Sequence, residues 1–491
     1  MSTELARPVK PRLLWLTLLL SAGVVVGAAA AATQPKLTLG GIVAACVFVL
    51  AFRMPVANLS LLLFLTAVVP YGILNRFSIG GGINSPGLLF SDVFLLAGLA
   101  WAALALPQLP LDRRRYWYAL SMVCFLVVVF LQFVHGLMSG HARSVVGQEG
   151  RVLLGFGTCL IALPLLAHPL SRRRLLAALS VAALLLGAWG MLQWLGHVSF
   201  GAAGDVGVRA GVRLTSGGGG QLQGGEFGYP VAIILCLAAL ASGKIRSGLW
   251  RATLLAALAL NAASCLVTFE RSFWLDSLAG LAFVLVFTAR GQRRIKVLAV
   301  VSAAAVSALV ALSVFAPATL TTAQQRLNSI GGYASDSSVR YRVVESGFVY
   351  DRIRAHPLEG SGLGATIFWG QPWARVPPKA RNYSHDGYLW LAWKVGIPAA
   401  ALLVALLVLA VPARSARGEE MLSVALRRGA QGAIVGLLVA TITFPSFSQL
   451  SIAPVIGLLL ALAISPMTAP AAALAAERRR HQAPVAAISV R

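Results

Sequence analysis

The sequence predicts an all-α protein that crosses a membrane many times. The chain of 491 residues is 58% hydrophobic and has only 16 acidic residues, and its mean hydropathy is +0.79. Apolar runs long enough to cross a hydrocarbon core of ~30 Å recur from end to end. Because a backbone in lipid must satisfy its own hydrogen bonds, each run is expected to be helical. We therefore predict about 12–14 transmembrane helices.

The apolar runs are separated by short polar loops, with one exception near the C-terminus. Three runs (37–52, 229–242 and 430–444) are short, which is why the predicted helix number is a range. The runs cover residues 13–31, 37–52, 54–72, 89–108, 117–138, 152–170, 175–196, 229–242, 252–270, 272–289, 297–316, 387–412, 430–444 and 452–468.

This spacing divides the chain into four parts. Residues 1–316 are predicted to form an N-terminal transmembrane bundle with short outer loops, and residues 317–386 a long outer loop. Residues 387–468 supply the C-terminal transmembrane helices, and residues 469–491 form a cytoplasmic tail. No convincing cleavage site follows the first run, so we expect a retained signal anchor.

The basic residues indicate the orientation in the membrane. The formal net charge is +25, yet most Lys and Arg residues fall in loops that alternate onto one side. Such an excess marks the cytoplasmic side, which places both termini inside and 317–386 outside. The charge therefore needs no nucleic-acid partner. The clusters are Arg7/Lys10/Arg12, Arg113–Arg115, Arg172–Arg174, Lys244/Arg246/Arg251, Arg290/Arg293/Arg294/Lys296, Arg414/Arg417/Arg427/Arg428 and Arg478–Arg480.

Cysteine and histidine patterns give no sign of a metal or cofactor. The five cysteines all lie in apolar runs, and none forms a CxxC pair, so we interpret them as small core residues. The histidines are scattered, and HExxH, GxSxG and an outward Asp-x-Asp are missing. If the protein is an enzyme, a mechanism independent of metal is expected.

Several arginines lie on the predicted outer side, where orientation does not require them. A cluster of guanidinium groups suits a phosphate or pyrophosphate, which accepts two-point hydrogen bonds. Contact with lipid headgroups is the alternative. These residues are Arg209, Arg213, Arg271, Arg326, Arg340, Arg342, Arg352 and Arg354.

Two of these arginines have informative neighbours. Arg271 stands in a short turn between two apolar runs, where Glu270 or Asp276 is an alternative partner to an anionic ligand. Arg342 falls in a predicted helix over 338–353, on a different face from Arg340. The helix is expected to end before His356-Pro357-Leu358, and Gly360, Gly362 and Gly364 to form a flexible connection back to the membrane.

His385 is the strongest candidate for proton transfer, because an unperturbed imidazole titrates near neutral pH. It stands where the long loop re-enters the membrane, in Ser384-His385-Asp386-Gly387-Tyr388. Asp386 is a candidate for orienting the ring, although neighbours on a helix point apart. A structural hydrogen-bonding role is the alternative for His385. Lys394, inside the next run, receives no role.

Together these positions resemble the bacterial O-antigen ligase and O-antigen polymerase superfamily. The resemblance rests on the order and spacing of four short motifs between residues 209 and 398. They are Arg213 followed by Phe227-Gly228-Tyr229-Pro230; Glu270-Arg271-Ser272; Arg342 followed by Pro357-Leu358-Glu359-Gly360-Ser361-Gly362; and His385-Asp386-Gly387-Tyr388-Leu389 followed by Gly396-Ile397.

The resemblance implies a membrane glycosyltransferase fold of the GT-C-like type in the bacterial inner membrane. It implies transfer of a glycan from a polyprenyl-pyrophosphate carrier to a hydroxyl on a lipid, glycan or protein acceptor, on the periplasmic side and without a metal. Arg271, Arg342 and Arg213 are then the pyrophosphate-binding residues and His385 the general base. Arg209, Arg340, Asp386 and Tyr388 are further possible site residues.

Two departures from the usual motifs affect these assignments. Asp386 replaces the usual Asn, and Glu270 replaces the usual Ser. Ligase and polymerase differ only in their acceptor, and the sequence favours ligase only slightly. A flippase for lipid-linked saccharides and a membrane scaffold are the alternatives from other classes. A flippase predicts ionisable residues along the spans, whereas most here line the outer rim.

Overall fold

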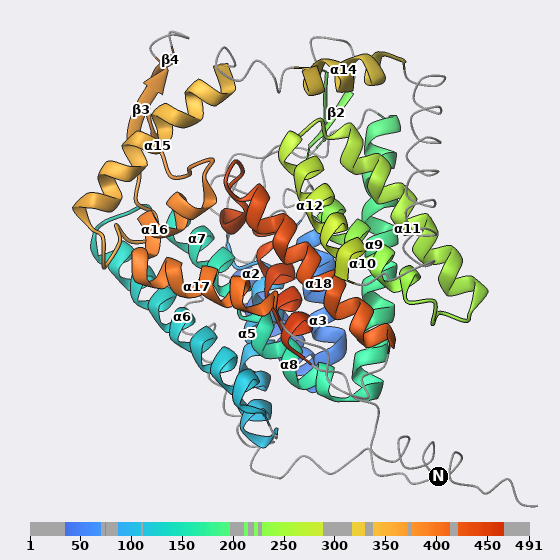
Figure 1. Ribbon diagram of the computed structural model, residues 1–491. Helices are drawn as coiled ribbons and strands as arrows, with labels where there is room; N and C mark the ends of the chain where they lie inside the picture. The colour runs from blue at the N-terminus through green and yellow to red at the C-terminus, as the bar shows by residue number, and fades with distance from the viewer. Residues whose placement is uncertain are drawn as a thin grey trace, which may run out of the picture.

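The computed structural model shows a helical bundle with a smaller layer of elements at one end (Figure 1). That layer contains α14 (Pro317–Asn328), α15 (Ser337–Ala355) and the strands β3 (Ile367–Gln371) and β4 (Val376–Arg381). The structure describes residues 35–69, 74, 87–109, 111–196, 211–214, 220–223, 228–287, 317–328, 337–371, 376–412 and 421–465.

The N-terminal half of the bundle is a succession of helices with short connections. They are α2 (Pro35–Arg53), α3 (Pro55–Ala67), α5 (Phe90–Ala105), η1 (Leu106–Gln108), α6 (Arg113–Met138), α7 (Arg143–Gly155), α8 (Thr158–Ala167) and α9 (Pro169–Gly196).

The C-terminal half adds further helices and a second small hairpin. Strands β1 (Gly211–Leu214) and β2 (Gly220–Gln223) pair antiparallel between α9 and α10. The helices are α10 (Gly228–Ala241), α11 (Gly248–Val267), α12 (Arg271–Phe287), α16 (Gly387–Val395), α17 (Ile397–Ala410), α18 (Met421–Ala440), η3 (Ser446–Ser448) and α19 (Ala453–Ile464).

The predicted class, an all-α protein with several membrane spans, is confirmed. Within the described ranges, 6 helices are long and apolar enough to cross a membrane, and five shorter apolar helices accompany them. The two antiparallel hairpins, β1–β2 and β3–β4, were not expected from the sequence. Two predicted spans, 13–31 and 297–316, lie outside the described residues.

Three predicted span boundaries differ from the structure. The span predicted at 152–170 begins at Arg143, since Glu149 and Arg151 are paired inside the bundle. The run 430–444 belongs to a helix that begins at Met421. The run 387–412 is broken into α16 and α17 at Gly396, whose φ is +84°.

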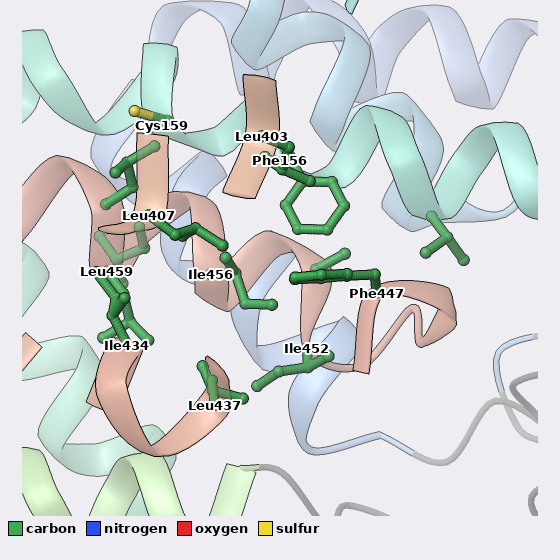
Figure 2. Packing of buried hydrophobic residues seen from close by; sticks show 14 of the residues in the cluster. Phe156, Cys159, Leu403, Leu407, Ile434, Leu437, Phe447, Ile452, Ile456 and Leu459 are labelled. Carbon is green, nitrogen blue, oxygen red and sulfur yellow. The ribbon is translucent and has the colours of Figure 1, made fainter. Parts of the chain in front are cut away.

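The core lies where α8, α17, α18 and α19 meet (Figure 2). Phe156 packs edge-on against Phe447, with ring centroids 6.1 Å apart. Close approach requires small residues here: a Cβ at Gly457 would collide with the Thr158 hydroxyl, whose Oγ1 donates to the Pro454 carbonyl at 2.6 Å. Small residues that allow backbones to approach are the usual basis of helix packing in membranes.

The five cysteines are all free, as their spacing predicts. Their placement differs in part from the expected core positions. Cys159, Cys236 and Cys265 are buried, but Cys46 and Cys124 are exposed on their helices.

Candidate functional site

His385 lies in the short link between β4 and α16. The link is held at its C-terminal side by Asp386, whose carboxylate accepts hydrogen bonds from the backbone N–H of Tyr388 (2.9 Å) and Leu389 (3.0 Å). Asp386 is therefore the N-cap of α16. The Gly387 N–H donates to the Thr441 carbonyl at 2.9 Å, which ties this link to the end of α18.

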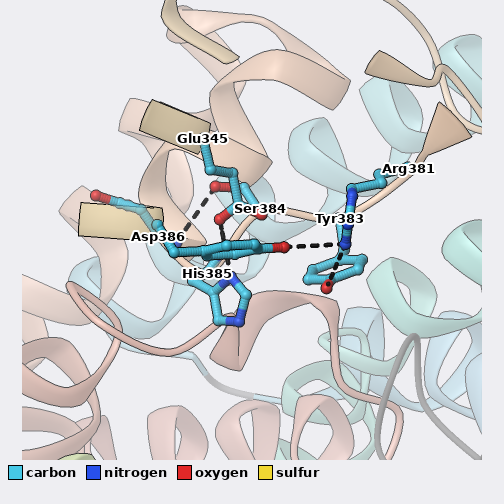
Figure 3. Close-up of polar contacts among 7 residues, drawn as sticks. Glu345, Arg381, Tyr383, Ser384, His385 and Asp386 are labelled. Atoms are coloured by element: carbon cyan, nitrogen blue, oxygen red, sulfur yellow. Dashed lines mark hydrogen bonds and ion pairs between the residues drawn. The ribbon is translucent and has the colours of Figure 1, made fainter. Parts of the chain in front are cut away.

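Glu345 on α15 is the residue that orients the imidazole (Figure 3). Its carboxylate oxygen Oε2 lies 2.8 Å from Nδ1 of His385 and also accepts the His385 backbone N–H at 2.8 Å. The Glu345 side chain is fully buried, whereas 27% of the His385 side chain is exposed. Asp386 was the candidate for orienting the ring. In the structure its carboxylate caps α16 instead, and Glu345 makes the contact with the imidazole.

This arrangement leaves one ring nitrogen of His385 for chemistry. Nδ1 is engaged by the carboxylate, and within the described part of the chain Nε2 has no hydrogen-bond partner. A carboxylate on Nδ1 favours the tautomer with a proton there and a lone pair on Nε2. The exposed face of the ring can therefore accept a proton.

Aromatic rings surround the imidazole. The rings of Tyr341 and Tyr383 approach it edge-on, with centroids 5.3 Å and 5.4 Å away. Arg381 joins them: its Nη1 donates to the Tyr341 hydroxyl at 2.9 Å and to the Tyr383 hydroxyl at 3.4 Å. Its guanidinium also lies 4.9 Å from the Trp369 ring centroid, a cation–π distance.

The Tyr341 hydroxyl stays protonated at this site. Burial raises the pKa of Tyr341 well above its ordinary value, and the neighbouring Tyr383 raises it further. Tyr341 therefore presents a neutral hydroxyl beside His385. Neither Arg381 nor the two tyrosines were singled out from the sequence, because aromatic and basic residues in a loop carry no spacing signal.

The glycine-rich segment after α15, residues 357–364, forms a clasp against the end of α16. Gly360, Gly362 and Gly364 have φ of +72°, +81° and +80°, a conformation that residues with a Cβ rarely adopt. Ser361 N–H donates to the Trp393 carbonyl at 2.8 Å, and Ile397 N–H to the Pro357 carbonyl at 2.9 Å. These glycines therefore supply positive φ angles to a hydrogen-bonded turn, and the flexibility expected of this connection stays a prediction.

The clasp fixes α15 against the end of α16. A Cβ at Gly396 would collide with the Leu358 carbonyl oxygen, and one at Gly360 would lie 2.5 Å from the Gly396 nitrogen. Glycine is therefore required on both sides of this contact. Because Glu345 is on α15 and His385 precedes α16, the clasp sets their relative position.

A second buried pair lies beneath the clasp. Lys394 Nζ contacts Glu149 Oε1 at 2.8 Å, and both side chains are at most 1% exposed. Glu149 Oε2 also accepts the Gly364 N–H at 2.7 Å, and Lys394 donates to the Ala365 carbonyl at 2.6 Å. Lys394, which had no role in the sequence interpretation, thus holds α16, α7 and the clasp together.

The predicted arginines occupy different elements. Arg342 follows Tyr341 on α15 and is half-buried, whereas Arg340 is exposed. Arg271 is the first residue of α12. Arg213 lies in β1, opposite Gln221 of β2, and Arg209 lies outside the described residues.

Packing joins the start of α12 to the region of His385. The ring of Phe273, two residues after Arg271, lies 4.9 Å from Phe444. Phe444 belongs to the same turn as Thr441, which holds Gly387. The preceding turn is strained, since Phe269 has a φ of +52°, and such strain is common at functional sites.

Two further candidates make structural contacts. The Tyr388 hydroxyl donates to the Leu438 carbonyl at 2.6 Å, which joins α16 to α18. Asp276 is fully buried on α12, and a Cβ at Gly436 of α18 would collide with its carboxylate. Among the residues that the structure describes, no group of three or more His, Cys, Asp or Glu side chains could hold a metal ion.

The fold and the site define a multi-pass membrane protein with a carboxylate-oriented histidine at one end of its bundle. Comparison with known families identifies the region concerned: residues 256–404 match the family model described as O-antigen ligase. This match confirms the resemblance to the O-antigen ligase and polymerase superfamily over the segment that contains Arg271, Arg342, Glu345 and His385. No curated protein matches the chain.

Proposed function

We propose that this protein transfers a glycan from a polyprenyl-pyrophosphate carrier to a hydroxyl acceptor at the periplasmic face of the inner membrane. The family match supports activity of the O-antigen ligase or polymerase type in general. The observation that carries the finer proposal is the Glu345–His385 pair, with Nδ1 engaged at 2.8 Å and the ring partly open.

In the proposed reaction His385 is the general base. Nε2 takes the proton of the acceptor hydroxyl while that oxygen attacks the anomeric carbon of the carried glycan. The bond between this carbon and the pyrophosphate oxygen breaks, and the carrier pyrophosphate leaves with the electron pair. Glu345 holds the ring and stabilises the imidazolium that forms.

Arginines supply the positive charge for the leaving group. Arg271 and Arg342, together with Arg213, bind the pyrophosphate and stabilise the charge that develops on it. A guanidinium fork forms two parallel hydrogen bonds with phosphate oxygens. These arginines can therefore take the place of a divalent cation, and the reaction is expected to tolerate EDTA.

The ligase reaction is our first choice, because the matched family model carries that description. Tyr341 and Tyr383 lie beside His385, and Arg381 donates to both hydroxyls; we assign these three side chains to the acceptor site. Aromatic rings pack against the apolar faces of sugar rings, and a guanidinium binds carboxylate or phosphate substituents.

The test is a transfer assay with purified protein in detergent and EDTA. The protein is supplied with a polyprenyl-pyrophosphate glycan and a panel of lipid, glycan and protein acceptors, and release of the free carrier pyrophosphate is followed. Acceptor-dependent release that survives EDTA supports the proposal, and the productive acceptor separates ligase from polymerase. Movement of the lipid-linked glycan across liposomes without release would instead indicate a flippase.

Arg271→Ala sharpens this test. Losing one charge-stabilising donor costs about 3–4 kcal/mol of barrier, so release should fall by roughly 10²–10³-fold. The matched control is Arg143→Ala, which removes an exposed arginine at the first position of α7. Equal activity in the two variants would remove Arg271 from the proposed site.

A further inference from the structure

A cavity of about 480 Å³ lies between α3, α9, α10, α11, α18 and α19. Its walls are almost wholly aliphatic, formed by residues such as Leu63, Ala183, Leu235, Leu426 and Leu459. Its volume is in the range of sites that hold a small ligand. An apolar space of this kind inside a membrane bundle suits a hydrocarbon chain.

The cavity is elongated along the bundle. On α10 alone, its wall extends from Gly228 to Ala239, which is about 16 Å along a helix axis. This length suits an extended acyl chain lying parallel to the helices.

One end of the cavity is polar and positively charged. Arg173, near the start of α9, and Arg246 and Ser247, in the link between α10 and α11, line it together with Trp250. This link is at the end of α10 opposite the β1–β2 hairpin. Two guanidinium groups at the end of an apolar space are complementary to a phosphate ester that carries a hydrocarbon chain.

The cavity is separate from the His385 site. Leu422 and Leu426, in the first turns of α18, line the cavity, whereas Thr441 at the other end of α18 holds Gly387 beside His385. The interval from Leu426 to Thr441 corresponds to roughly 22 Å of helix.

We propose that this cavity binds an anionic phospholipid of the surrounding bilayer. The phosphate is held by Arg173 and Arg246, and one acyl chain fills the space between α9, α10 and α19. Basic pockets between transmembrane helices are a known means of holding anionic headgroups. This proposal does not depend on the transfer reaction, since it concerns the opposite end of α18.

The test measures lipid affinity by native mass spectrometry of the full chain in detergent. Phosphatidylglycerol and phosphatidylcholine are titrated separately against the wild type, the double variant Arg173→Ala/Arg246→Ala, and the control Arg174→Ala/Arg251→Ala. The control removes two exposed arginines near the starts of α9 and α11 that do not line the cavity. Thermal unfolding without added lipid checks that each protein is folded.

We expect the wild type to prefer phosphatidylglycerol by about 25-fold, since each arginine near a headgroup contributes roughly fivefold. The double variant should lose this preference, and the control should keep it. Equal loss in the control would show only diffuse surface attraction and would overturn the proposal, as would a wild type without preference.

A cavity-filling variant tests where the acyl chain lies. Ala183→Leu adds bulk to the wall and should weaken both phospholipids by a similar factor, leaving the headgroup preference unchanged. Unaltered binding of both lipids would overturn the placement of the chain. Displacement of phosphatidylglycerol by a substoichiometric polyprenyl phosphate would also overturn the proposal, because the occupant would then be a carrier lipid.

Discussion

Two buried glutamates, Glu149 and Glu345, are each paired with a basic side chain, and the two pairs differ in how much of the basic side chain is exposed. In the Glu149–Lys394 pair both side chains are sealed from solvent. In the Glu345–His385 pair the glutamate is sealed, but 27% of the histidine side chain is exposed. The first pair uses its charge within the fold, whereas the second keeps a ring nitrogen available for a substrate.

The difference follows from the partners that each pair has. Lys394 also donates to the Ala365 carbonyl and lies 4.1 Å from the Trp393 ring centroid, so its contacts are structural. His385 has a single carboxylate on Nδ1 and two aromatic edges around it. In this protein the partly exposed Glu345–His385 pair is therefore the candidate for chemistry, whereas the contacts of the buried Glu149–Lys394 pair hold the fold together.

The largest expected effect is on catalysis. His385→Ala should lower acceptor-dependent carrier release by about 10²–10⁴-fold, because it removes the general base. Its thermal unfolding midpoint should stay close to that of the wild type, since the side chain is partly exposed. Near-wild-type release by this variant would refute the role of His385 as the general base.

Changes in the Glu149–Lys394 pair should affect mainly the stability of the protein. Lys394→Met leaves Glu149 buried without its partner, which costs about 3–5 kcal/mol of stability. Denaturant or thermal unfolding in detergent measures this loss, and Lys244→Met, at an exposed lysine, is the control.

The double variant Glu149→Leu/Lys394→Met completes that comparison. Replacing both members of a buried ion pair with apolar groups is often close to neutral, so most of the lost stability should return. A double variant as unstable as the single one would show that the hydrogen bonds to Gly364 and Ala365 matter more than the charges.

A smaller effect is expected at Glu345. Glu345→Gln keeps the size of the side chain but removes the charge that holds the His385 ring, and a misplaced catalytic group can cost up to about 10²-fold. The loss should appear in kcat while KM for the donor changes little, as a positioning residue predicts. Glu359→Gln, at an exposed position in the clasp, should behave as the wild type.

The smallest effect is expected at the N-cap of α16. Burial raises the pKa of the Asp386 carboxyl above its ordinary value. Folding then favours the protonated carboxyl, so Asp386 adds to the stability of the protein at pH values below the pKa of this carboxyl in the unfolded chain. This added stability is lost as the pH rises through the higher pKa of the carboxyl in the folded protein. Asp386→Asn, which keeps a good N-cap, should be slightly more stable than the wild type at neutral pH.

This advantage should disappear in acid, where the wild-type carboxyl is protonated as well. Unfolding midpoints of both proteins across the acid range measure the difference. A constant difference at all pH values would mean that the carboxyl does not titrate with folding.

The sequence by itself determined the class of protein and most helix positions, and it singled out His385 as the candidate general base. Long apolar runs form helices across a bilayer because a helix satisfies its own backbone hydrogen bonds. The motifs around Arg271, Arg342 and His385 lie in the segment that matches the O-antigen ligase family. These features are local, so periodicity and short motifs report them.

Only the tertiary structure decided which side chains act on one another. Glu345 and His385 are separated by 40 positions, and Glu149 and Lys394 by far more. Their pairing depends on glycines with positive φ, which allow the clasp to pack closely against Gly396. No local pattern encodes such contacts, because they arise from the packing of helices that are distant in the chain.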